Sequence, residues 1–403
     1  MDGLGYLVPY LLDWMNMLVR WLHVITGIAW IGASFYFVWL DNSLRPPAPG
    51  SDLAQKGVAG ELWAVHGGGF YNPQKYLVAP AALPKELHWF KWEAYSTWLS
   101  GFALLLIVYW FNAQAMMVDR GVADLSSAQA IGIGLASLVA GWVVYDLLCR
   151  SKLGRHDLAF GVVVFALLVA ASWVLTHFLS GRAAYIHVGA MIGTIMVANV
   201  AMVIIPGQRR MVDAMRAGRQ PDPIYGQRGK QRSVHNNYFT LPVLFIMISN
   251  HFALTYGHPH AWAVLATIMA AGVFIRHFFN LRHKGRVAWI YPAVGVALLL
   301  GLAVALAPAR PSASTETASF AQVQAIVAQR CASCHAAHPT QPGFASAPAG
   351  VLLDDAHGIA QNAPRIYQQA VQLKAMPLAN MTGMTEAERA RLGAWYRGGA
   401  KTD

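Results

Sequence analysis

The residues with the clearest chemistry lie near the C-terminus, in the motif Cys331-x-x-Cys334-His335. Cys-x-x-Cys-His is the attachment signature of a c-type haem: the two thiols add to the haem vinyl groups, and the imidazole becomes an iron ligand. A zinc site is the alternative, but it needs four ligands, and the remaining cysteine, Cys149, cannot supply the missing partners. The motif therefore predicts a covalently bound haem c and a function in electron transfer.

A methionine sulfur some tens of residues after the motif is the expected second iron ligand, as in electron-transfer cytochromes c. Met376, Met381 and Met384 all qualify. We choose Met376, because an axial methionine followed by proline is common in short domains of this kind, and keep Met381 as the alternative. The methionines that do not bind iron are expected to pack in the core. The predicted metal ligands are thus His335 and Met376.

Two predicted helices frame the motif. Residues 319–330 read as an amphipathic helix, and residues 385–400 read as a closing helix that opens with a Thr-x-x-Glu capping box. Residues 308–317 are rich in Pro, Ser and Thr, which is typical of a linker. These features predict a small α-helical class I cytochrome c domain over residues 318–403.

The chain before the linker has the composition of a membrane protein. Of the 403 residues, 56% are hydrophobic and 12% charged, whereas a soluble protein is about one quarter charged. The net charge is +11, but the basic residues fall between apolar runs, so we expect a lipid bilayer and no nucleic acid as a partner. Residues 1–307 are therefore predicted to form an all-α polytopic membrane helix bundle. About eight segments are long enough to cross roughly 30 Å of hydrocarbon, near residues 14–38, 97–117, 128–149, 157–178, 184–206, 238–256, 261–281 and 287–307.

The basic residues also predict the orientation of the bundle. The connections after the third, fifth and seventh spans are rich in Lys and Arg, whereas the alternate connections hold little beyond Arg120 and Arg182. The positive-inside rule then places both termini outside the cytoplasm. Haem c is attached on the periplasmic side in bacteria, which agrees. We expect a multi-pass protein of the bacterial inner membrane with no cleavable signal peptide, because the N-terminus is acidic and opens directly into the first span.

Four histidines are predicted to lie in the outer third of the bilayer. Intramembrane ionisable groups are costly in lipid and often mark function, and two facing histidines can hold a b-type haem between helices. The alternative is that these histidines form hydrogen bonds between helices or lie in the wet interface. The four candidates are His23, His177, His187 and His251.

A second polar group is predicted on the inner side, from the long first loop and the inner ends of the sixth and seventh spans. Glycines beside aromatic residues suit a pocket that stacks a flat ligand, and Lys, Arg and Asn suit an anionic, imide-rich one. The alternative for each residue is a solvated loop or a side chain that reaches the interface. The candidates are His66, His88, Glu93, His235, Asn237, Arg276 and His277.

Several stretches together are similar to one family. These are Leu62 to Tyr71, Ser233 to Pro242, Ser249-Asn250-His251 and Met376 to Thr385. With them, the whole chain resembles the bacterial membrane-bound urate oxidases fused to cytochrome c. The resemblance implies oxidation of urate to 5-hydroxyisourate by a transmembrane oxidase domain. It also implies that electrons leave through haem c to a soluble cytochrome c or cytochrome c oxidase and do not form hydrogen peroxide.

The inner polar group fits this chemistry, because urate is a planar monoanion at neutral pH. We hypothesise that Arg276 or Lys91 neutralises it, Trp89 or Phe70 stacks on it, and one histidine acts as the base. The rival is a non-catalytic, membrane-anchored cytochrome that passes electrons from a separate dehydrogenase or quinol to a terminal oxidase. A weaker rival is a transporter with a redox gate. The long first loop favours the enzyme, since an anchor does not need it.

Overall fold

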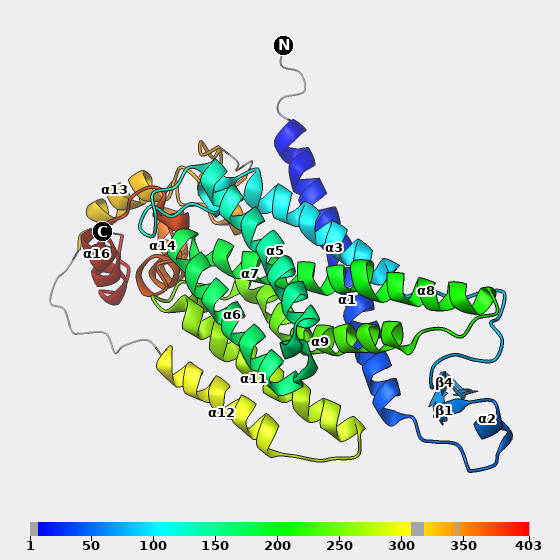
Figure 1. The fold of residues 1–403 in the computed structure, drawn as a ribbon. Coiled ribbons are helices and arrows are strands. Elements are labelled where there is room, and N and C mark those ends of the chain that lie inside the picture. Colours follow the sequence, from blue (N-terminus) through cyan, green and yellow to red (C-terminus); the bar gives the residue numbers. More distant parts are fainter. Residues whose placement is uncertain (1–6, 308–317, 343, 345, 403) are drawn as a thin grey trace.

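The structure of the protein is a computed structural model that describes residues 7–307, 318–342, 344 and 346–402. Most of the described chain is helical (Figure 1). Long helices form a bundle, and a smaller group of helices follows it toward the C-terminus. The predicted linker, residues 308–317, lies outside the described residues.

The bundle is built from helices whose apolar composition requires burial in lipid or protein. Several run on without a break: α3 continues into the π-helix η1, and α7 continues through the π-helix η3 into α8. α5 starts at a capping box in which the side chains of Ser126 and Gln129 each accept from the other's backbone N–H. The bounds are α1 Leu7–Ser43, α3 Trp92–Leu104, η1 Leu105–Trp110, α5 Ser127–Arg150, α6 Asp157–Phe178, α7 Gly181–Ala198, η3 Asn199–Ile204, α8 Ile205–Arg216, α9 Pro223–Ile248, α11 Ala261–His283 and α12 Ile290–Ala305.

Five described helices are long and apolar enough to cross a membrane, and the sequence predicts about eight spans. The five correspond to the spans predicted near 14–38, 128–149, 157–178, 184–206 and 261–281. The last predicted span is the apolar but shorter helix α12. α9 begins at Pro223, fifteen residues before the predicted span at 238, and its first half is polar. The sequence-based count of spans is therefore supported for the five helices and stays a prediction for the others.

The long first loop is not wholly irregular, which corrects a strictly all-α description. β1 pairs with β4 and β2 pairs with β3, both antiparallel, so that one hairpin is nested inside another. Short helical turns complete the connections between the long helices. The bounds are α2 Asp52–Gln55, β1 Val58–Glu61, β2 Ala64–His66, β3 Gly69–Tyr71, β4 Gln74–Tyr76, α4 Ala113–Met116, η2 Lys152–Arg155, η4 Ser249–His251 and α10 Ala253–Tyr256.

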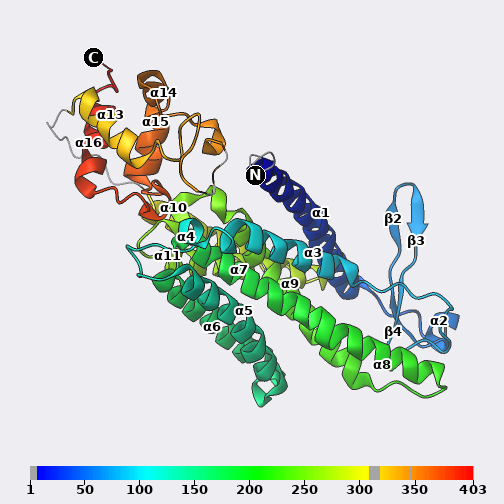
Figure 2. The ribbon, with the colours of Figure 1, turned by 90° about the horizontal axis from the view of Figure 1, so that it is seen from above.

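The centre of the bundle is α7, most of whose side chains are buried. Its neighbours include α5 and α6 on one side and α9 on another (Figure 2). We call the end of the bundle with the strands and the tip of α8 the hairpin end. The opposite end, with α4 and α10, is the domain end, because the C-terminal helices lie there (Figure 2).

The C-terminal helices have an apolar core of their own, which includes Val323, Val327, Leu392 and Trp395. Both predicted helix starts are confirmed: Ser319 and Thr385 each form a capping box with the residue three positions on. Leu373 and Ala375 pack against the bundle core, so the two parts touch. The elements are α13 Phe320–Arg330, η5 Pro348–Gly350, α14 Ala356–Gln361, α15 Ala363–Ile366, η6 Tyr367–Gln372, η7 Leu378–Asn380 and α16 Glu386–Arg397.

Candidate functional site

A cavity of about 640 Å³ lies toward the hairpin end of the bundle. The second half of α1 and the first half of α9 form its main walls. Residues from α3, η3 and α8, the end of α11 and the segment Pro73–Lys75 complete it. Two of the predicted site residues, Glu93 and Asn237, line this cavity.

The cavity contains buried polar atoms without a partner. Glu93 Oε2, Asn237 Nδ2 and Asn280 Oδ1 are buried and make no hydrogen bond within the described part of the chain, and all three residues line the cavity. Leaving such a group unpaired typically costs about 1–3 kcal/mol. The three residues that carry these two acceptors and one donor thus line a space large enough for a small ligand, which suits a molecule with donors and acceptors in alternation.

Arg276 lies directly behind these groups and orients them. Its Nε donates to Asn237 Oδ1 at 2.9 Å, and Asn280 Nδ2 donates to the same oxygen at 3.0 Å. Because both bonds use the Asn237 oxygen, its Nδ2 is the atom left for a ligand. The Arg276 guanidinium lies 4.2 Å from the centroid of the Phe35 ring, and its Nη2 is a further buried, unpaired donor.

The charge on Arg276 is also uncompensated. Among the ion pairs formed by the described residues, none includes Arg276. A buried cation without a counter-ion favours an anionic ligand close by. The cavity therefore combines a positive charge with the donor and acceptor pattern of a flat amide or imide.

The part of the chain that forms this cavity matches a known family. A family model described as "Urate oxidase N-terminal" matches residues 9–307. The chain belongs to this family. Searches of curated proteins and of solved structures gave no match to the chain.

In this member of the urate oxidase N-terminal family, a tyrosine–histidine pair adjoins the cavity. The Tyr238 hydroxyl lies 2.6 Å from His277 Nδ1, and Tyr238 lines the cavity. The sequence predicts a role for His277, whereas Tyr238 enters only as part of the stretch Ser233 to Pro242 and has no role assigned to it. Asn280, by contrast, is placed by the sequence beside Arg276 and His277 in the inner polar group, and it follows Arg276 by four residues, one turn along the helix.

His235 does not face the cavity. Its Nδ1 lies 2.7 Å from the Tyr145 hydroxyl, and its ring stacks on Phe160 with centroids 4.6 Å apart. Successive helical residues point about 100° apart, so Asn237 faces the cavity while His235 faces α5 and α6. The sequence correctly groups these residues on α9 but assigns His235 to the wrong face.

The first loop reaches the cavity through residues other than the predicted histidines. His66 is exposed at the end of β2, outside the cavity lining. His88 is also exposed, and its ring packs 4.6 Å from that of Phe90, which lines the cavity. The first loop therefore contributes Phe90 and the segment Pro73–Lys75 to the cavity lining, and its two histidines lie outside that lining.

The residues that the sequence predicts to stack on the ligand or to neutralise its charge also lie outside the cavity lining. Phe70 is 77% exposed, and neither it nor Trp89 lines the cavity. Lys91 lies 5.7 Å from the centroid of the Trp92 ring at the start of α3. The aromatic surface of the cavity comes from Trp30, Phe37, Phe90, Tyr225 and Tyr238.

Two of the four outer histidines are shielded from solvent, one in part and one fully, and both form hydrogen bonds between or within helices. His23 Nδ1 lies 3.0 Å from the Thr97 carbonyl oxygen. His187 is fully buried; its Nδ1 lies 2.8 Å from the Ala183 carbonyl oxygen, and its Nε2 accepts from the Trp110 indole at 3.1 Å. These contacts correspond to the hydrogen-bonded alternative that the sequence leaves open.

The other two are exposed. His177, at the end of α6, has its Nδ1 2.7 Å from the Trp173 carbonyl oxygen one turn back on the same helix, and His251 lies in η4 at the domain end. Within the described residues, no hydrogen bond or ring contact joins any two of the four histidines. Haem b stays a prediction.

The C-terminal motif forms a tight turn directly after α13. The backbone N–H groups of Cys334 and His335 both donate to the Cys331 carbonyl, at 3.1 and 3.0 Å. His335 Nδ1 lies 3.0 Å from the Val351 carbonyl oxygen, so Nδ1 carries the proton and Nε2 is left for a metal. In the described part of the chain, no three His, Cys, Asp or Glu side chains gather as a metal site. The turn thus fits a haem, with two thiols and one oriented imidazole.

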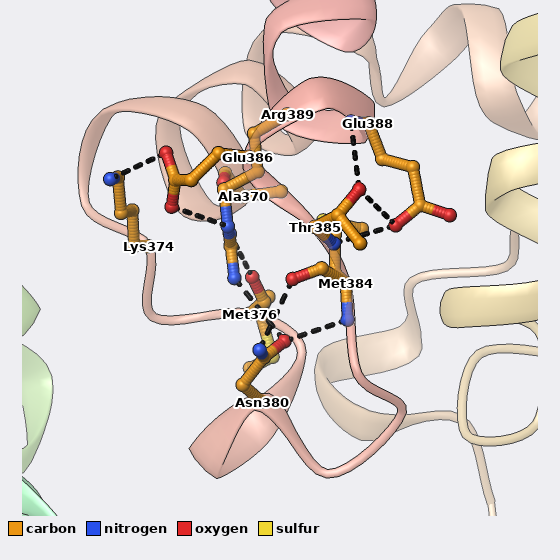
Figure 3. A network of polar contacts seen from close by, with 9 residues as sticks. All are labelled: Ala370, Lys374, Met376, Asn380, Met384, Thr385, Glu386, Glu388 and Arg389. Carbon is orange, nitrogen blue, oxygen red and sulfur yellow. Dashed lines mark hydrogen bonds and ion pairs between the residues drawn. The ribbon is translucent and has the colours of Figure 1, made fainter. Parts of the chain in front are cut away.

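The loop with the candidate methionines is held by α16 (Figure 3). Arg389 is buried and donates to the carbonyls of Ala370 and Met376, the latter at 2.8 Å. Asn380 bonds both the backbone N–H and the carbonyl of Met384, at 2.9 and 3.1 Å. Met384 lies in the apolar core with 3% exposure, while Met376 and Met381 are only half-buried. The geometry thus separates a packing methionine from the two candidates for the iron.

Proposed function

We propose that this protein is a membrane-bound urate oxidase whose cavity between α1, α9 and α11 converts urate to 5-hydroxyisourate. The observation that carries the proposal is the set of unpaired atoms in the cavity, Glu93 Oε2, Asn237 Nδ2 and Asn280 Oδ1. They lie within the segment that matches the urate oxidase family. A membrane-anchored electron-transfer cytochrome, the rival function, has no use for such a cavity.

The ligand atoms of urate match these protein atoms. Urate carries ring N–H donors next to carbonyl acceptors, and it is a monoanion at neutral pH. Asn237 Nδ2 would donate to a carbonyl oxygen, and Asn280 Oδ1 and the Glu93 carboxylate would accept from ring N–H groups. Arg276 would balance the negative charge.

The pair Tyr238–His277 is our candidate for proton removal. Conversion of urate and water to 5-hydroxyisourate releases two protons and two electrons. Tyr238 lines the cavity, and its hydroxyl lies 2.6 Å from His277 Nδ1. It can pass a proton from the substrate to the histidine as the electrons leave.

The electrons need an acceptor, which we assign to a haem c in residues 318–403. Cys331 and Cys334 would hold the group covalently, and His335 and Met376 or Met381 would bind its iron. A bound haem c supplies reversible one-electron chemistry. In this proposal both termini are periplasmic, the cavity faces the cytoplasm of a bacterial inner membrane, and a soluble cytochrome c or cytochrome c oxidase receives the electrons.

The decisive experiment adds urate to the purified full-length protein without oxygen. A pyridine haemochrome spectrum counts covalent haem, and the visible spectrum shows whether urate reduces it. We expect reduction by the wild type and a loss of about 10- to 100-fold in rate for Asn237→Ala, because an unpaired polar ligand atom costs about 1–3 kcal/mol. Asn112→Ala, outside the cavity, is the matched control. A protein that stays oxidised, or an Asn237→Ala variant with full rate, contradicts the proposal.

A further inference from the structure

A second cavity, of about 840 Å³, lies beside the first and is strongly basic. The end of α5, the turn η2, the start of α8 and the first turns of α9 surround it. None of the described residues that line it is acidic. Its lining includes five arginines: Arg150, Arg155, Arg210, Arg228 and Arg232.

The charges of these arginines are only partly compensated. Asp146 pairs with Arg150 at 2.6 Å and with Arg232 at 2.7 Å, so one carboxylate serves two guanidinium groups. Arg210 donates to the hydroxyl of Tyr225 at 3.2 Å, which leaves its charge unneutralised. For Arg155 and Arg228, no ion pair forms with any part of the chain that the structure describes.

Gathering like charges around one space raises the electrostatic energy of the empty protein. An anion that binds several of these arginines at once would lower this electrostatic energy. Guanidinium groups present paired N–H donors that match the oxygens of a phosphate group. The cavity is therefore suited to a phosphate-bearing ligand.

The position of the cavity favours a lipid as the source of that phosphate. It lies where the apolar helix α5 ends and the apolar helix α6 begins, which is the depth of the headgroups if these helices cross a membrane. Met202 and Ile224, at 62% and 36% exposure, add an apolar wall along which an acyl chain can lie. A soluble phosphate compound would not need this wall.

We propose that this basic cavity binds the headgroup of an anionic phospholipid. The site is separate from the proposed urate cavity, although Tyr225 lines both and α9 forms the wall between them. The inference does not rest on the proposed function, because it concerns binding alone.

The test compares Arg155→Gln/Arg228→Gln with a control of equal charge, Arg209→Gln/Arg219→Gln, whose arginines are exposed and outside the cavity lining. Full-length proteins are placed in nanodiscs of phosphatidylcholine with one fifth phosphatidylglycerol, and retained lipid is counted by native mass spectrometry. We expect the wild type and the control to retain phosphatidylglycerol, and the cavity variant to retain at least about tenfold less.

Two results would overturn the proposal. One is equal retention in all three proteins, and the other is equal loss in the control, which would mean general surface charge. A second arm titrates inorganic pyrophosphate into protein in pure phosphatidylcholine nanodiscs by calorimetry. Pyrophosphate binding that the cavity variant loses, with no retained phosphatidylglycerol in the wild type, would assign the cavity to a soluble phosphate compound and refute the lipid.

Discussion

Buried polar groups differ between the bundle cavity and the C-terminal part of the chain. In the cavity, Glu93, Asn237 and Asn280 each keep one buried atom unpaired. In the C-terminal part, the buried guanidinium of Arg389 donates hydrogen bonds to backbone carbonyls. A buried atom without a partner can gain a hydrogen bond when a ligand binds reversibly, whereas a buried atom that is already paired holds a loop in one conformation. The first arrangement suits a substrate and the second a permanently attached group.

The largest expected effect concerns Arg276, the charge behind the cavity. Arg276→Gln should lower kcat/KM for urate by at least about 30-fold, since losing a buried, hydrogen-bonded charge typically costs about 2–5 kcal/mol. Arg282→Gln, exposed at the end of the same helix, is the control. If both variants keep wild-type kinetics, the cavity does not bind an anion.

The next effect concerns proton removal. Tyr238→Phe keeps the ring but removes the hydroxyl, and we expect kcat to fall about 100-fold with little change in KM. Tyr291→Phe is the matched control, because the Tyr291 ring packs 4.4 Å from that of His277 and lies outside the cavity. Equal kcat in the two variants would remove Tyr238 from the reaction.

A stability effect should appear in the other region. Arg389→Gln removes the bonds to Ala370 and Met376, and we expect the free energy of unfolding of the C-terminal part to fall by about 1–3 kcal/mol. Pulse proteolysis in urea, with C-terminal fragments identified by mass spectrometry, measures it. Arg391→Gln, an exposed neighbour on α16, should change little.

The smallest effect is a dependence on pH. Burial acts to raise the pKa of Glu388, but hydrogen bonds with Thr385 and Arg330 outweigh it and hold that pKa below its ordinary value. Glu388 therefore stabilises the domain above the pKa of the unfolded chain, and this contribution disappears as pH falls through the folded pKa. In Glu388→Gln, unfolding measured from pH 6 to pH 3 should show a shallower loss of stability. An unchanged pH profile would contradict the assignment.

Contiguous features were predictable from the sequence, and features assembled across helices were predictable only in part. The capping box at Thr385 depends on four consecutive residues, so the local pattern was enough to predict it, and the same kind of pattern is present at Ser319. Glu93 and Asn237, which the sequence assigns to one pocket, both line the first cavity. His235 was assigned to the wrong face, because its orientation depends on the rotational phase of α9 against its neighbours.

Other parts carried no usable signal. The strands β2 and β3 have three residues each, too few for a period to be recognised. The polar network behind the cavity, in which Asn199 donates to Asn236 and Tyr145, joins residues from three helices. Hydrogen bonds between residues so far apart in the sequence depend on how the helices pack, so no single stretch of sequence predicts them.

The π-helix η3 has a consequence for the register of the chain. A π-helical turn holds one residue more than an α-helical turn, and Val200 and Ile204 of this segment line the cavity between α1, α9 and α11. If the same residues were wound as an ordinary α-helix, everything beyond them would be turned by about 100°. Gln208 and the arginine at 210 would then leave their respective cavities together. The one extra residue in this π-helical turn thus determines which α8 side chains face each of the two cavities.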